Sequence, residues 1–123
     1  TLIWILPHNH LFIYKIIKDK LYEMVSEYSF DENNEKGVYF FMYEFTSSLV
    51  NEIEQYQSNK FIDNSFEFIN HLGESNNLEV QNIIKVGVLE ILYTSENLER
   101  KKIEELLSEK LRPVFRSFSK YYY

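Results

Sequence analysis

The pattern of apolar and polar positions predicts helices along most of the chain. From about Asn9 to Phe30, apolar residues recur at three- and four-residue steps, as in an amphipathic helix. Val38–Gln57 begins with the aromatic run VYFFMYEF and ends in polar residues, which predicts a second helix. Aromatic residues also favour strands, but no second strand is available to pair with this run. The segment Asp31–Gly37 is a polar loop between the two helices, and Thr1–Leu6 is a short apolar run that fits an extended segment.

We predict that the stretch from Phe61 to Tyr93 forms the centre of the fold. Its first half, Phe61–Leu72, places apolar residues near one side and acidic residues on another. Gly73 follows at the position where a left-handed residue commonly closes a helix. Because only a few residues separate this helix from the next apolar run, we expect the two to pack antiparallel as an αα-hairpin.

The second half of this stretch is apolar on almost every side between Leu78 and Leu92, which is typical of a buried helix. Its β-branched residues also suit a strand, but the run is longer than most strands and does not alternate. Asn76, three residues before Glu79, predicts a capped start. Gly87 in the helix interior predicts the close approach of a neighbouring helix.

The C-terminal part of the chain predicts one more helix and a short helical turn. A break at Thr94–Asn97 precedes apolar residues from Leu98 to Leu111, including Leu106, within a segment rich in Glu, Arg and Lys. Pro113 should end or kink this helix. The tail should then place Phe115 and Phe118 on the core.

Length and composition favour one all-α domain. At 123 residues, with 45% hydrophobic and 17% aromatic residues, the chain holds enough apolar surface for one core. We therefore predict a single domain over residues 1–123, a compact bundle of five or six helices with the αα-hairpin at its centre. The absence of Cys rules out disulfides and thiolate zinc sites. No apolar run approaches the length that spans a bilayer, so we expect a cytoplasmic protein with no membrane partner.

Charge is distributed unevenly along the chain. The net charge is −6, but residues 21–99 hold fifteen acidic residues and three lysines, whereas residues 100–123 hold seven basic and three acidic residues. An acidic field of this kind repels nucleic acid and attracts a basic partner. A solvated surface that keeps the protein soluble is the alternative explanation.

Few residues have the spacing of a catalytic or metal site. His8 and His10 form an HxH pair, and His71 is the third histidine, but closed metal sites need four ligands. No glycine-rich phosphate loop and no nucleophile motif is present. We predict no enzymatic activity, no metal and no cofactor.

The C-terminal tail allows a different function, that of a nucleic-acid-binding or regulatory helical protein. Its basic residues alternate with aromatic ones, a pattern that can follow a nucleic-acid backbone and stack on bases; these residues are Arg112, Phe115, Arg116, Phe118, Lys120 and Tyr121–Tyr123. The acidic middle of the chain opposes that function. A docked tail whose basic residues pair with the acidic middle is the simpler interpretation.

The segment NSFEFINHLGESNNLEVQNIIKVGVLEILY, with its capped helix start and the sequence VGVLEIL, resembles a segment of small α-helical bacterial immunity proteins. These proteins belong to contact-dependent growth inhibition and other polymorphic toxin systems. The resemblance covers about a quarter of the chain, mostly core-type residues. It implies a cytoplasmic protein without enzymatic activity that binds and blocks a cognate toxin domain, often a nuclease. No individual binding residue can be carried over from it.

The partner surface is predicted from the residues instead. A nuclease presents basic residues to hold phosphates, so an inhibitor can match them with acids and accelerate encounter by electrostatic steering. Tyr is favoured at interface hot spots. The residues expected to bind the toxin are Glu52, Glu54, Tyr56, Asp63, Glu67 and Glu74.

Overall fold

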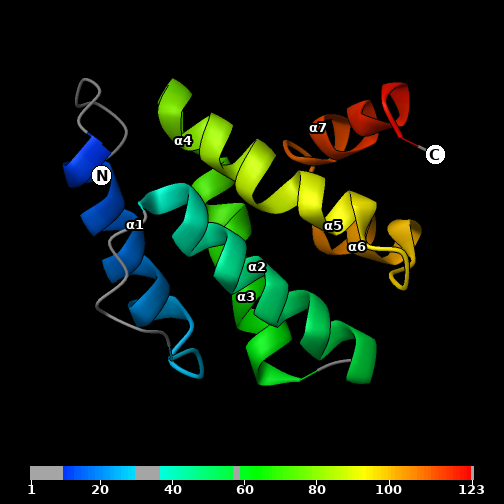
Figure 1. Cartoon of the computed structure of the whole chain (residues 1–123), viewed down its shortest axis with the longest axis horizontal. Coiled ribbons are helices and arrows are strands. Elements are labelled where there is room, and N and C mark those ends of the chain that lie inside the picture. The colour runs from blue at the N-terminus through cyan, green and yellow to red at the C-terminus, as the bar shows by residue number, and fades with distance from the viewer. Residues whose placement is uncertain (1–9, 30–36, 57–58, 123) are drawn as a thin grey trace.

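The computed structural model describes residues 10–29, 37–56 and 59–122, and this part of the chain is helical with no strand (Figure 1). Its elements are α1 (His10–Met24), α2 (Val38–Gln55), α3 (Lys60–Gly73), α4 (Leu78–Ile84), the π-helical turn η2 (Lys85–Leu89), α5 (Glu90–Thr94), α6 (Arg100–Leu106), α7 (Arg112–Ser117) and the 3₁₀ turn η3 (Phe118–Lys120). Because α4, η2 and α5 are consecutive, they form one continuous helix. The all-α prediction is confirmed. None of the described helices is both long and apolar enough to cross a bilayer.

The continuous helix α4–η2–α5 lies at the centre, and α3 packs against its first part, as the predicted hairpin requires. The same helix also contacts α2, α6 and α7, while α1 packs on α3 (Figure 1). Its buried residues Ile83, Val88 and Leu89 join the aromatic residues of α2 and α3 in one core. The expected burial on all sides is wrong, however, because Leu78 is 71% exposed. Val86 is exposed as well, so this helix has an outer face.

Asparagine side chains cap both helices of the hairpin. Asn59 Oδ1 accepts a hydrogen bond of 2.8 Å from the backbone N–H of Ile62 at the start of α3. Asn77 Oδ1 accepts from Glu79 and Val80 at the start of α4, at 2.9 and 3.1 Å. An N-cap side chain reaches the amides two and three positions ahead, so Asn77 and not the predicted Asn76 holds this position.

Two glycines allow close packing. Gly73 does not adopt the predicted left-handed conformation; it is the buried last residue of α3, and an added Cβ would lie 2.7 Å from the side chain of Leu111. At Gly87 an added Cβ would lie 3.2 Å from Met42 Cβ. The predicted approach of a neighbouring helix at Gly87 is therefore confirmed, and that helix is α2.

Several helix ends differ from the predicted ones. α1 ends at Met24, although Val25 and Tyr28 beyond it are still buried. α6 ends at Leu106, well before Pro113, and Pro113 lies in the first turn of α7. There its missing N–H removes no helical hydrogen bond, so Pro113 helps to start a helix and does not end one. The predicted extended segment Thr1–Leu6 lies outside the described residues, as do residues 31–36 of the predicted loop.

Candidate acidic interface at the junction of helices α2 and α3

Five of the six predicted partner residues lie near the junction where α2 ends and α3 begins: Glu52, Glu54, Tyr56, Asp63 and Glu67. The two glutamates of α2 are in its last turns, and Tyr56 follows directly as the C-cap residue. Asp63 and Glu67 are exposed on the outer face of α3, one turn apart. Glu74 is separate, because it follows α3 eleven residues after Asp63, about 16 Å along the helix axis.

The first groove at this junction, the Glu52 groove, has a volume of about 640 Å³ and is lined by Glu27, Tyr28, Ser29, Ser48, Asn51, Glu52, Asn59, Lys60 and Phe61. Asn59 Nδ2 donates to the carboxylate of Glu52 at 3.1 Å. The side-chain amide of Asn64 donates to both carboxylate oxygens of Glu27, at 3.2 and 3.4 Å. A backbone hydrogen bond and then this amide lower the pKa of Glu27, because both favour its charged form.

The second groove, the Tyr56 groove, has a volume of about 520 Å³ and is lined by Ile53, Glu54, Gln55, Tyr56, Ile62, Asn97, Leu98, Glu99, Lys102, Ile103 and Leu106. Its exposed apolar side chains are Tyr56, 51% exposed, and Leu106, 42% exposed. Leu106 belongs to the apolar pattern that predicted the helix, and it is exposed. Glu99 and Lys102 form an exposed ion pair at 3.7 Å.

The first turn of α3 separates the two grooves, since Phe61 lines the Glu52 groove and Ile62 lines the Tyr56 groove. The described carboxylates that line the grooves are those of Glu27, Glu52, Glu54 and Glu99, and Asp63 lies in the turn itself, with Glu67 one turn further along α3. The two lysines there are Lys60 and Lys102. The junction is therefore an acidic surface with two exposed apolar side chains, a composition suited to binding a basic protein. We call it the acidic junction.

Sequence reasoning missed Glu27, Glu99 and Leu106. Glu27 follows the end of α1, and its place beside α3 depends on the contact with Asn64, which no sequence spacing indicates. Leu106 occupies an apolar position of a helical pattern, but α6 ends there, so the residue remains partly exposed.

The described residues include no group of three His, Cys, Asp or Glu side chains that could hold a metal ion. His8 lies outside the described residues, and the side chain of His10 is not described, so the HxH pair has no geometry to report. Burial lowers the pKa of His71, because it disfavours the charged imidazolium.

The C-terminal tail is docked, as predicted, but its two arginines have other partners than the acidic middle. Phe115 and Phe118 are buried against Tyr93, with ring centroids 5.2 and 5.9 Å away. The guanidinium of Arg112 donates to the backbone carbonyls of Glu104 and Leu107, each at 3.0 Å. Arg116 pairs with the carboxylate of Glu104. The predicted pairing with the acidic middle is thus wrong for both arginines, which bind α6 and the residue after it.

A family model described as a domain of unknown function, DUF7674, matches residues 14–123. The chain belongs to the DUF7674 family. The match begins within α1 and includes every described element after it, so the acidic junction lies within the DUF7674 domain. No curated protein and no solved structure matches the chain.

Proposed function

We propose that this DUF7674 protein is an immunity protein that binds and neutralises a basic toxin domain, a ribonuclease or deoxyribonuclease, through the acidic junction. The observation that carries the proposal is the joining of five carboxylates from four parts of the chain in and around the first turn of α3, with exposed Tyr56 and Leu106 beside them. Glu67 lies one turn further along the same helix. The resemblance of the central segment to immunity proteins supplies the class of partner. In that role the protein acts stoichiometrically, in the cytoplasm, without a catalytic step.

The arrangement suits both stages of binding. A net negative surface raises the rate of encounter with a basic protein, because long-range attraction orients the partners before contact. The Tyr56 groove then provides an anchor, since an aromatic side chain buries a large area with few rotatable bonds. The carboxylate of Glu52 is already held by Asn59, which reduces the entropy lost when it meets a cationic side chain.

Nucleic-acid binding by the tail is the alternative function, and the side-chain contacts give it little support. Phe115 and Phe118 are buried and so have no free face for a base. Arg112 and Arg116 bind α6 and its C-terminal end. We expect mixed RNA and DNA at about 100 mM salt to bind no tighter than the 10⁻⁴ to 10⁻⁶ M that is typical of nonspecific contacts.

The test is co-expression with the C-terminal domain of the large modular surface protein that the immunity function requires to be encoded beside this gene. The proposal predicts that this domain alone stops growth, that co-expression restores it, and that the two proteins elute together as a 1:1 complex. A toxic domain that is neither bound nor neutralised contradicts the proposal. Absence of any such neighbouring gene contradicts it as well.

A further inference from the structure

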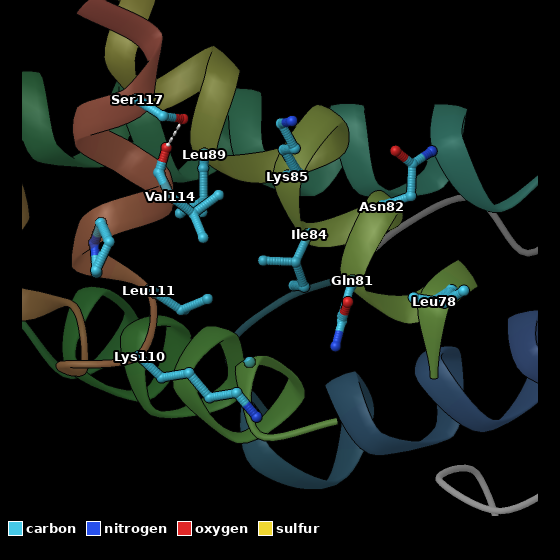
Figure 2. Close-up of a pocket in the computed structure, with 12 residues that line it drawn as sticks. Leu78, Gln81, Asn82, Ile84, Lys85, Leu89, Lys110, Leu111, Val114 and Ser117 are labelled. Carbon is cyan, nitrogen blue, oxygen red and sulfur yellow. Dashed lines mark hydrogen bonds between the residues drawn. The ribbon is translucent and has the colours of Figure 1, made fainter. Parts of the chain in front are cut away.

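A third groove lies on the other side of the central helix, between α4–η2 and α7 (Figure 2). Its volume is about 590 Å³, within the usual range of small-molecule sites. We call it the lysine groove; its lining residues are Gly73, Leu78, Gln81, Asn82, Ile84, Lys85, Leu89, Lys110, Leu111, Pro113, Val114 and Ser117. The acidic junction shares none of these residues.

The charge of this groove is opposite to that of the molecule. The chain carries a net charge of −6, yet the described residues that line the groove include two lysines and no carboxylate. Figure 2 shows Lys85 on one wall and Lys110 on the other, with Ile84 and Leu111 between them. The Glu52 and Tyr56 grooves are each lined by two glutamates and one lysine. The lysine groove is therefore complementary to an anion.

The two cations differ in how firmly they are held. Lys110 Nζ donates to the backbone carbonyl of Glu74 at 3.2 Å, which fixes the ammonium and leaves two of its three donors available. Lys85 is exposed and begins the π-helical turn η2, and Leu89, which ends that turn, also lines the groove. π-helical turns inside α-helices are frequent at functional sites, because the extra residue changes the direction of side chains.

The remaining walls of the groove are largely apolar, and they run along the axis of the central helix. Leu78, Ile84 and Leu89 follow one another along the twelve residues of α4 and η2, about 16 Å from the first to the last. Leu111 and Val114 face them from the α7 side (Figure 2). Leu78 at one end is an exposed large apolar side chain, which a ligand would remove from water.

We infer that the lysine groove binds a single-chain amphipathic anion, with its alkyl chain along the apolar walls and its acid group at the rim held by Lys110, while Lys85 adds positive potential from the opposite wall. The apolar walls disfavour a compact polar anion as the ligand, because phosphate or sulfate would leave these walls in contact with water. A cationic amphiphile with the same chain would meet two like charges. This site is separate from the acidic junction and does not depend on the proposed immunity function.

The test uses two probes of equal chain length and opposite charge, dodecanoate and dodecyltrimethylammonium, each below the concentration at which it forms micelles. Titration into the full chain, followed by amide NMR shifts and calorimetry, should show 1:1 binding of dodecanoate with shifts at Leu78, Leu89 and Val114. The cationic probe should bind at least tenfold more weakly. Absence of dodecanoate binding, or equal affinity for both probes, overturns the inference.

Paired variants locate the head group. Lys85→Glu combined with Lys110→Glu should weaken dodecanoate at least tenfold, whereas Lys101→Glu combined with Lys120→Glu makes the same charge change at exposed lysines outside the groove and should weaken it less than twofold. Equal losses in both variants would mean that net charge alone attracts the probe, and would overturn the site. Val114→Trp, which fills the groove without altering charge, should also abolish binding. If the groove shifts appear on concentrating the protein without probe, a second copy of the chain occupies it and the inference is wrong.

Discussion

The hydroxyl of Thr46 donates a hydrogen bond of 2.9 Å to the carbonyl oxygen of Gly87. The contact is buried and joins α2 to the π-helical turn of the central helix, forty-one residues away. At the same place the missing side chain of Gly87 lets Met42 approach. This buried polar contact and this close apolar contact therefore help to hold α2 on the central helix, and α2 carries part of the acidic junction at its C-terminal end.

Thr46→Val tests this contact. Valine has nearly the same shape but cannot donate, so the buried carbonyl loses a partner at a cost of about 1–3 kcal/mol. The free energy of unfolding should fall by that amount in urea denaturation. The control is Thr94→Val, whose hydroxyl bonds within its own helix at an exposed position and whose loss should stay within about 0.5 kcal/mol. Equal effects at both sites would mean that the Thr46 contact does not hold α2.

The burial of the central helix is tested by two leucines in it. Leu89→Asp places an unpaired charge in the core, where Leu89 is fully buried, and should cost several kcal/mol or prevent folding. Leu78→Asp makes the same chemical change at the exposed first residue of α4, where an acid is also favoured by the helix dipole. That variant should melt within a degree or two of the parent. Similar melting temperatures for the two variants would contradict the orientation of this helix.

The hairpin was predictable because its apolar positions repeat with the period of a helix and a short polar loop separates the two runs. The outer face of its second helix was not predictable, since Leu78 and Val86 are apolar residues that the fold leaves exposed to water. Gly73 was misinterpreted because glycine suits both a left-handed turn and a close contact, and only the tertiary position of Leu111 distinguishes the two.

The hydrogen bonds of Arg112 to the end of α6 should contribute more to the free energy of unfolding than the ion pair of Arg116. Arg112 donates to the carbonyl of Glu104 in the last turn of α6 and to that of Leu107 just after it, so Arg112→Met removes charge-assisted hydrogen bonds and should cost about 1.5–3 kcal/mol. Arg116→Met removes only an ion pair whose arginine is exposed, which is worth about 0–1 kcal/mol. Chemical denaturation of both variants measures the difference. A larger loss in the Arg116 variant would contradict this account of how the tail is held.

Glu27 should make the stability of the fold at the acidic junction depend on pH. Since hydrogen bonds lower its folded pKa, they stabilise the fold above the pKa of the unfolded carboxyl group, and this stabilisation is lost as pH falls through the lower folded value. Asn64→Ala should raise the pKa of Glu27 towards its ordinary value in an NMR titration. Asn82→Ala, which removes a hydrogen bond to Tyr39 instead, should leave it unchanged. A Glu27 pKa that is insensitive to Asn64 would contradict the contact.

Acidic residues near the junction were identifiable from the sequence because α2 and α3 are adjacent along the chain, so their neighbouring ends must meet. Glu27 and Glu99 could not be identified in this way, since these residues reach the junction through tertiary contacts at the ends of α1 and α6. Glu74 was included on helical spacing, which specifies the face of α3 but not the distance along it.

The most direct test of the proposed immunity function is the association rate with the toxin domain encoded beside the gene. Asp63→Lys combined with Glu67→Lys reverses two exposed charges at the junction and should leave the melting temperature almost unchanged. Asp19→Lys combined with Glu109→Lys makes the same net change at exposed positions outside the grooves. The account predicts that the first pair slows association at least tenfold, with a loss that shrinks as salt is added, and reduces protection of growing cells, whereas the second pair has a much smaller effect. Equal association rates and full protection with both pairs would contradict the acidic junction as the toxin-binding surface.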